Sequence, residues 1–504
     1  MFKTILKIAD KHIYITTAFL SLIISLWLFA SRDIISRDAV LYVNAAQAFL
    51  DDGIGAAFEV LGWPFYSITI AVIHKLTGLS LEYSAYVLTI LLETIISVTF
   101  VKLYAKIAFD GARLWVAMLF ILTFVTLNDY KGDIWREYGF LAFSLLALYQ
   151  FILYFQSHNK LNALLWQLCI FTATLFRTEA IIFAVLAPFY FLFIYNDSFA
   201  ERIKNLLILN SIFYSIGLID IIIILLSSQL QDLILNNLPS QIVYLSAKEI
   251  FGNFNLAADN FVKHVLPFDY SAGYSHLIIA SGLLSMLIFK LMKNFTLVYM
   301  GIWLSGSYKQ WINKKQESNI IYYFASISLL ILLVFITTRL FVSTRYTVFL
   351  LLLIGLVFTQ YLDYVLSYLT QHKHKFLLIA LGMFITVQFL DSIISTGAKK
   401  FPMQHSSEWL IENIKAGDKI ACNEKRFDYY SKQNCKLENN RFYNNYNQSD
   451  IQYLKDNNFT YLLLWVKHKN TTMLNTLELD NNLILLKKFK NKRDDLALVF
   501  KIKD

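Results

Sequence analysis

The chain has 504 residues, of which 57% are hydrophobic and only 16% are charged. A soluble protein of this length carries nearer a quarter charged residues, so the composition excludes an ordinary soluble enzyme and predicts a protein solvated mainly by lipid. The net charge of +9 is spread over short loops, which argues against a nucleic-acid-binding surface and favours a membrane orientation signal.

Apolar runs long enough to cross a bilayer recur along the chain. The first is too long for a cleavable signal peptide and lacks a small-residue cleavage site, so we expect it to remain as an anchor. The predicted spans, about eleven in number, cover residues 13–30, 84–103, 114–127, 138–155, 161–176, 180–195, 206–226, 277–292, 320–336, 347–365 and 376–394. The shorter segment 63–76 suits a helix at the membrane interface. Segment 295–304 either extends the preceding span or lies on the inner surface.

Basic residues recur in every second loop between these spans. They are Lys3, Lys7, Lys11, Lys102, Lys106, Arg113, Lys160, Arg202, Lys204, Lys309, Lys314, Lys315, Lys373 and Lys375. The positive-inside rule places these loops in the cytoplasm. The sequence therefore predicts a multi-pass protein of a bacterial inner membrane, with a cytoplasmic N-terminus and a periplasmic C-terminal domain.

The chain after about Lys399 is polar and rich in Asn and Lys. Residues 408–415 and the stretch from Ser449 favour helices, and the apolar runs from Thr460 and Leu496 favour buried strands. We expect an all-α polytopic membrane bundle over residues 1–398 and a small soluble α/β domain over residues 399–504. In a periplasmic domain Cys422 and Cys435 are either a disulfide or two unpaired thiols.

Ionisable residues on the predicted outer face gather in four short clusters at span ends. These are Arg37–Asp38, "GDIWRE" from Gly132 to Glu137, "RTE" from Arg177 to Glu179 and "RLFVSTRY" from Arg339 to Tyr346. Charged groups at membrane depth default to a functional interpretation unless they reach water or a partner. The acids lie mainly on the early loops and the arginines on the later ones.

Each cluster also has a structural explanation. Asp38 or Ser36 can cap the helix that follows, and Glu137 and Asp133 can lie in a solvated loop paired with Lys131 and Arg136. The pair Arg177 and Glu179 can simply close a turn between two spans, and Arg345 can extend its guanidinium to lipid headgroups.

The repetition of these clusters on one face favours group transfer. A carboxylate can deprotonate an acceptor hydroxyl or amine that attacks an activated carbon. Arginines can bind a phosphate leaving group through charge-assisted hydrogen bonds. A lipid-linked donor needs no nucleotide site, and no Walker-type or Rossmann glycine pattern is present among the 17 glycines.

The membrane part resembles the polytopic GT-C-fold glycosyltransferases, in the branch of protein O-mannosyltransferases and bacterial lipid A aminoarabinose transferases. The resemblance is carried by the pattern D-x-x-x-Y-x-x-x-A at Asp38, by "WPFYSITIAVIHKLTG" from Trp63, by "WREYGFLAF" from Trp135, by "FRTEA" from Phe176 and by "TRY" from Thr344. It departs from the family where Ala39 replaces the second acid of an Asp-Glu pair, and where Glu137 stands for the more usual Asp.

This resemblance implies residue roles. Asp38 would be the general base, and Glu137 or Asp133 would support it. The substrate-binding set would comprise Arg37, Asp133, Arg136, Arg177, Glu179, Arg345 and Tyr346, with Arg345, and Arg136 or Arg177, facing the lipid phosphate. Members of the family differ in metal use, and two carboxylates alone are a poor metal site. We therefore predict no cofactor and no obligatory metal, with a divalent cation left open.

The implied function is an inverting hexosyl- or pentosyltransferase. It would move a sugar from a polyprenyl-phosphate donor to a lipid, glycan or protein acceptor of the cell envelope, on the outer face of the inner membrane. Two alternatives remain open. One is a transporter or flippase of a lipid-linked sugar, which would place charges near the bilayer midplane. The other is an envelope polysaccharide polymerase or ligase using the same donors.

Overall fold

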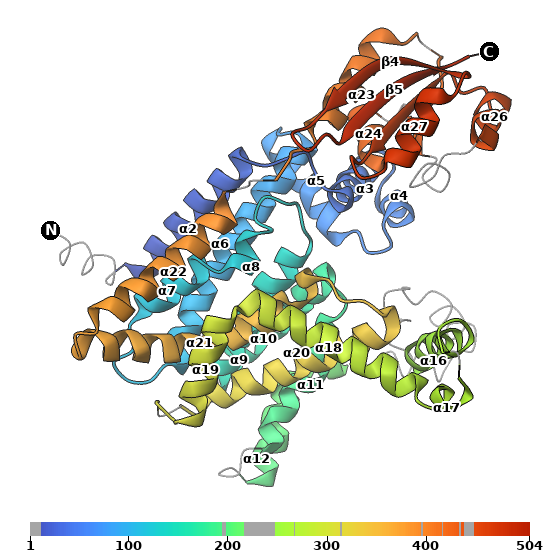
Figure 1. Ribbon diagram of the computed structural model, residues 1–504. Coiled ribbons are helices and arrows are strands. Elements are labelled where there is room, and N and C mark those ends of the chain that lie inside the picture. The colour runs from blue at the N-terminus through green and yellow to red at the C-terminus, as the bar shows by residue number, and fades with distance from the viewer. Residues whose placement is uncertain are drawn as a thin grey trace. The chain divides into compact units, whose positions relative to one another are not determined.

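The structure is a computed structural model that describes residues 12–193, 198–215, 247–266, 268–312, 315–394, 397–415, 417–432, 435–437 and 448–503 (Figure 1). The chain forms two compact units. The helical unit comprises Met1–Leu28, Ala45–Lys131 and Trp135–Ile393, and the sheet unit comprises Phe29–Asn44, Gly132–Ile134 and Ile394–Asp504. Each unit is described by itself.

Helices dominate the chain up to residue 393. They are α2 (Ile13–Ala30), α3 (Arg37–Asp52), α4 (Ile54–Val60), α5 (Phe65–Thr77), α6 (Leu81–Ile107), α7 (Leu114–Leu122), α8 (Val125–Asn128), α9 (Glu137–Ser157), α10 (Lys160–Phe176), α11 (Ala180–Leu186), the 3-10 helix η1 (Ala187–Phe193), α12 (Phe199–Leu209), α16 (Ala247–His264), α17 (Asp269–Ala272), α18 (Ser275–Phe295), α19 (Leu297–Tyr308), α20 (Glu317–Arg339), α21 (Thr344–Gln371) and α22 (Lys375–Ile393).

Seven of the described helices are long and apolar enough to cross a membrane, namely α2, α6, α9, α18, α20, α21 and α22. Helices α10 and the α11–η1 pair are apolar but shorter. The protein is therefore a membrane protein, and the larger count of about eleven spans stays a prediction.

Helix α2 begins and ends at the residues expected from the sequence, whereas two expected spans are interrupted. The span over residues 114–127 breaks at Thr123, which separates α7 from α8, and the span over residues 180–195 changes from α-helix to 3-10 helix at Ala187. Hydropathy cannot detect such breaks because the residues on both sides are equally apolar. Residues 216–226 of the seventh expected span lie outside the described residues.

Helices α21, α6 and α9 form the core of the helical unit. In their apolar windows, 83%, 67% and 61% of residues are buried, against no more than 22% in α2, α18 and α22. The second group therefore presents apolar faces suited to contact with lipid. An ion pair ties the core together, since the Nε of Arg113 donates to Oδ1 of Asp363 on α21 at 2.6 Å.

The first turn of α9 and the last turn of α10 approach closely at Gly139. A Cβ atom at this position would overlap the ring of Phe176, which ends α10 and also stacks against Phe143 at a centroid distance of 5.8 Å. Only glycine permits this approach. The contact brings together Glu137, which begins α9, and Arg177, which follows α10 directly.

The described residues of the sheet unit form five strands, β1 (Ile420–Cys422), β2 (Cys435–Leu437), β3 (Tyr461–Val466), β4 (Leu483–Lys490) and β5 (Leu496–Ile502). They lie in the order β2-β1-β3-β5-β4, with β1 parallel to both β2 and β3, and with β5 antiparallel to β3 and β4. The strands predicted from Thr460 and Leu496 are confirmed as β3 and β5. Cys422 and Cys435 lie on neighbouring strands as buried free thiols.

Both faces of this sheet are covered. Helices α26 (Gln448–Asp456) and α27 (Thr471–Leu479) supply Ile451, Leu454, Met473 and Leu477 to one apolar cluster. Helices α23 (Phe401–Asn413) and α24 (Lys425–Tyr430) cover the other face with Met403, Leu410 and Phe427. Coverage on both faces explains why β3 and β5 appear in the sequence as continuous apolar runs. The helices expected over residues 408–415 and from Ser449 correspond to the end of α23 and to α26.

Replacing Gly139 with alanine is expected to lower the stability of the helical unit by about 1–3 kcal/mol, because the added methyl group overpacks against the Phe176 ring. Thermal unfolding of the detergent-solubilised protein measures this loss. Gly382 on α22 is the matched control, since a Cβ there meets nothing within 4 Å. Equal melting temperatures for Gly139→Ala and Gly382→Ala would contradict the close packing.

Candidate functional site

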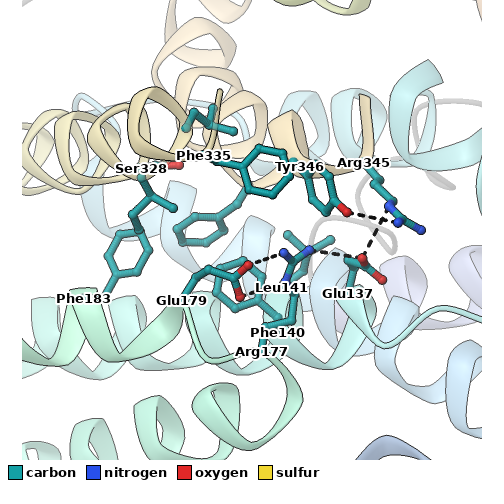
Figure 2. A pocket seen from close by; sticks show the side chains of 13 residues that line it. Glu137, Phe140, Leu141, Arg177, Glu179, Phe183, Ser328, Phe335, Arg345 and Tyr346 are labelled. Carbon is teal, nitrogen blue, oxygen red and sulfur yellow. Dashed lines mark hydrogen bonds and ion pairs between the residues drawn. The ribbon is translucent and has the colours of Figure 1, made fainter. Parts of the chain in front are cut away.

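A partly open pocket lies in the helical unit among α9, α11, α20, α21 and the turn between α10 and α11 (Figure 2). Its lining consists of Glu137, Phe140, Leu141, Arg177, Glu179, Phe183, Ser328, Ile331, Leu332, Phe335, Arg345, Tyr346 and Phe349. Figure 2 shows Arg345 and Glu137 at one end and Phe183 and Ser328 toward the other. The pocket thus combines a charged end with an aromatic and aliphatic wall.

The charged side chains come from the termini of helices. Glu137 is the first residue of α9, Arg177 and Glu179 form the turn between α10 and α11, and Arg345 and Tyr346 lie in the first turn of α21. The apolar wall comes from the following turns of the same helices and from α20. This arrangement follows from the sequence, where each charged cluster directly precedes or follows an apolar run.

Arg177 is held between two carboxylates. Its Nε donates to Oε2 of Glu179 at 3.1 Å, its Nη2 donates to the other oxygen of Glu179, and its Nη1 donates to Oε1 of Glu137 at 3.1 Å. All three side chains are buried or nearly so. The solvated loop considered for Glu137 is therefore wrong, because this carboxylate is buried and paired with an arginine from another turn.

Arg345 is bound less tightly. Its Nε lies 3.7 Å from Oε1 of Glu137, its Nη2 donates to the Tyr346 hydroxyl at 3.0 Å, and its side chain is 26% exposed. The Tyr346 ring also contacts both guanidinium groups, with the central carbons of Arg177 and Arg345 at 4.8 Å and 5.0 Å from the ring centroid. Arg345 is thus the more exposed of the two arginines that line the pocket.

Arg177 and Glu179 hold each other in the charged form. Burial alone would raise the pKa of Glu179, but the charge and hydrogen bonds of Arg177 outweigh it and lower this pKa to about 2. The two carboxylates likewise raise the pKa of Arg177 against the effect of burial. Arg136, predicted as a substrate-binding residue, does not line the pocket, yet its charge also lowers the pKa of Glu179. The second oxygen of Glu137, Oε2, is buried and finds no hydrogen-bond partner among the described residues.

A second charged cluster lies in the sheet unit and contains the other predicted acids. Burial raises the pKa of Asp133 to about 6, opposed by the charge of Lys400 and reinforced by the charges of Asp33 and Asp38. Asp38 and Asp133 are therefore close enough to interact electrostatically. Of the two candidates for the supporting acid, Asp133 is the one that the structure groups with Asp38.

Arg37, predicted to bind substrate, is paired with Glu424 of the sheet unit instead. Its Nε donates to Oε1 at 2.7 Å and to Oε2 at 2.9 Å. Glu424 lies in the polar C-terminal part of the chain. It is buried, but nothing in the surrounding sequence distinguishes it from the exposed acids of that part. Sequence analysis could not have found this pairing.

A further buried charge was missed although the sequence carried a signal for it. Glu93 lies in the middle of the apolar helix α6 and is fully buried, where it accepts a hydrogen bond from the Ser25 hydroxyl at 2.5 Å. The fully buried Lys131 attracts its charge. An acid inside a long apolar run is expected to have a specific partner, so Glu93 could have been singled out. Across the described ranges, no three His, Cys, Asp or Glu side chains are placed to hold a metal ion.

The fold resembles those of solved membrane enzymes. The archaeal oligosaccharyltransferase AglB from Archaeoglobus fulgidus, in complex with an inhibitory peptide and a dolichol-phosphate, superposes with a TM-score of 0.54 at 10% identity, over 91% of this chain and 70% of AglB. ArnT from Cupriavidus metallidurans bound to undecaprenyl phosphate superposes with a TM-score of 0.51 at 10% identity, over 97% of each chain.

The chain has the GT-C fold. This confirms the fold expected from the resemblance at Asp38, Trp63 and Trp135. No protein-family model and no curated protein matches the sequence. At 10% identity the likeness establishes the GT-C architecture, while the assignment of individual residues depends on the geometry described above.

Replacing Asp133 with asparagine is expected to remove a pH-dependent loss of stability. The folded-state pKa of about 6 exceeds the ordinary value of 3.8, so the folded protein binds more protons than the unfolded chain between these values and is destabilised as pH rises through them. The loss should be on the order of 1–2 kcal/mol, allowing for solvent screening. Melting temperatures from pH 4.5 to 8 measure it, with Asp52→Asn at an exposed position as the control. Parallel pH curves for wild type and Asp133→Asn would contradict the burial of this acid.

Proposed function

We propose that the protein is an inverting glycosyltransferase that moves a sugar from a polyprenyl-phosphate donor to an acceptor of the cell envelope, on the outer face of a bacterial inner membrane. The observation that carries this proposal is the pocket of the helical unit, in which a guanidinium stands beside an apolar wall. A lipid phosphate presents the complementary pair of groups. AglB and ArnT have been solved with dolichol-phosphate and undecaprenyl phosphate respectively, which supports this class of donor.

The donor phosphate is assigned to Arg345, with Tyr346 beside it. Arg177 already has two carboxylate partners, so we assign it a structural role in holding Glu137 and the turn in place. Glu137 then acts by positioning the two guanidiniums, since its Oε1 accepts from Arg177 and lies 3.7 Å from the Nε of Arg345. The polyprenyl chain would lie against Phe140, Phe183, Phe335 and Phe349.

In this mechanism Asp38 orients the acceptor and takes its proton, with Asp133 beside it. The acceptor oxygen or nitrogen forms a bond to the anomeric carbon while the bond from that carbon to the phosphate oxygen breaks. The electron pair leaves with polyprenyl phosphate, whose new negative charge is stabilised by the hydrogen-bond donors that bind the phosphate. Attack opposite the leaving group inverts the anomeric configuration.

Replacing Asp38 with asparagine is expected to reduce sugar transfer by about 10²–10⁴-fold, the usual contribution of a general base. Membranes incubated with a radiolabelled polyprenyl-phosphate sugar, followed by counting of labelled acceptor, provide the measurement. Asp52→Asn, at an exposed position near the other end of α3, is the matched control. Transfer at the wild-type rate by Asp38→Asn would remove Asp38 from the mechanism. Movement of intact donor across the membrane without transfer would favour a flippase.

Replacing Arg345 with glutamine is expected to raise KM for the donor by about 10–100-fold, because one charge-assisted hydrogen bond to phosphate contributes about 1.5–3 kcal/mol. Arg345→Lys should recover part of the loss, since it keeps the charge but not the planar geometry. The control is Arg339→Gln, which changes an exposed arginine at the end of α20 that does not line the pocket. An unchanged donor KM in Arg345→Gln would place the phosphate elsewhere.

A further inference from the structure

The segment that leads into α3 contacts the rest of the sheet unit at several points. Ile34 packs in the apolar cluster beneath α23 and α24. The backbone N–H of Lys400 donates to Oδ1 of Asp33 at 2.7 Å, and the Nζ of Lys399 donates to the Ser31 carbonyl at 2.7 Å. The backbone N–H of Ile35 donates to a tyrosine hydroxyl of α24 at 3.3 Å. These contacts hold the chain as far as residue 35.

The next contact joins Arg37, the first residue of α3, to the buried carboxylate of Glu424. Glu424 is 2% exposed and accepts from two arginines. The Nε of Arg37 donates to both of its oxygens, at 2.7 Å and 2.9 Å, and the Nε of Arg426 donates to Oε1 at 3.3 Å. Burial alone would raise the pKa of Glu424, but its hydrogen bond with Arg37 and the charge of Arg426 lower it overall. The carboxylate is therefore ionised when it binds Arg37.

This pairing constrains the first turn of α3 in a specific way. Arg37 and Asp38 are the first two residues of the helix, and consecutive side chains of an α-helix diverge by about 100°. A bidentate contact with a buried carboxylate restricts the motion of Arg37 and of the helix turn that carries it. Asp38 leaves the same turn of α3 as the next residue.

We propose that Glu424 is a positioning residue for the transfer reaction, which clamps Arg37 and thereby orients Asp38. This assigns the C-terminal domain a part in catalysis through a residue that itself touches no substrate. The inference rests on the proposed function in one respect, namely that Asp38 acts on the acceptor.

The contact between Glu424 and Arg37 is separate from the contacts that hold the segment preceding α3. Removing the charge of Glu424 leaves Ile34, Asp33 and Lys399 in place, so the segment should stay bound while the first turn of α3 gains freedom. Such a change affects the chemical step more than donor binding. A displacement of about 1 Å in a reacting group can reduce a rate by about 10²-fold.

The test is Glu424→Gln, which keeps the shape of the side chain and removes its charge. We expect kcat to fall by about 10–100-fold while KM for the polyprenyl-phosphate sugar changes less than about threefold. Glu424→Asp should recover part of kcat because it keeps the carboxylate. Hydrogen exchange of the backbone amides of residues 37–44 should become faster in Glu424→Gln, and this measurement does not depend on transfer activity.

Asp363→Asn is the matched control, because Asp363 is an equally buried carboxylate bound by an arginine Nε at 2.6 Å. It should lower stability without the same loss of kcat. Should Glu424→Gln fail to fold, Arg37→Gln removes the same contact from a side chain that is 45% exposed.

The outcomes separate this inference from the proposed function. If Asp38→Asn is inactive while Glu424→Gln and Arg37→Gln keep the wild-type kcat, the positioning role is overturned and the proposed function stands. Equal losses of kcat in Glu424→Gln and Asp363→Asn would also overturn it, since they would indicate a general structural effect. If Asp38→Asn itself transfers sugar at the wild-type rate, the proposed mechanism is contradicted, whatever the hydrogen-exchange rates of residues 37–44 are.

Discussion

An arginine buried between two carboxylates determines the geometry of the helical unit's pocket. Removing one partner from such a group leaves an uncompensated charge in a low-dielectric setting, at a cost of about 3–5 kcal/mol. Arg177 therefore requires both Glu137 and Glu179 beside it, and these residues begin α9 and precede α11. Because Arg177 needs both carboxylates, the end of α10 and the starts of α9 and α11 lie together. The close approach at Gly139 serves the same end, because it brings the last turn of α10 against the first turn of α9.

The same constraint separates the roles of the two pocket arginines. The Arg177 side chain is 10% exposed and donates to two protein carboxylates, while the Arg345 side chain is 26% exposed. A partly exposed guanidinium beside an apolar wall suits a ligand that is both anionic and lipidic. The proposed binding of the donor phosphate rests on this difference in exposure between the two guanidiniums.

The acids occupy a different structural setting. Asp38 and Asp133 come from two segments far apart in the sequence, and both belong to the unit built on the C-terminal sheet. Their neighbours Lys400, Glu424 and Arg426 are residues of the C-terminal domain. The C-terminal domain thus supports the two short segments that carry Asp38 and Asp133, because they pack with it in one compact unit.

Much of the fold could be predicted because apolar periodicity is strong in the helices and in β3 and β5. The bounds of α2 follow directly from its hydrophobic run. The strand β4 could not be predicted because its lysines interrupt the apolar pattern, and β1 and β2 are only three residues long. The break at Thr123 is conformational and leaves no mark in hydropathy.

For the site, the sequence indicated which residue types matter and where they lie along the chain. It could not indicate pairing, which depends on how the helix ends meet. The sequence grouped Glu137 with Asp38 as catalytic acids, whereas the structure binds Glu137 to Arg177 and groups Asp133 with Asp38. The binding of Arg37 to Glu424 joins residues 387 positions apart, a separation over which a single sequence carries no information.

The most direct test of this account is an experimental structure of the protein with undecaprenyl phosphate bound. The account predicts that the phosphate lies within hydrogen-bonding distance of the Arg345 guanidinium, while Arg177 keeps both of its carboxylate partners and the prenyl chain follows the wall formed by Phe140, Phe183, Phe335 and Phe349. A phosphate bound away from the first turn of α21, or one that draws Arg177 out of its contacts with Glu137 and Glu179, would contradict it.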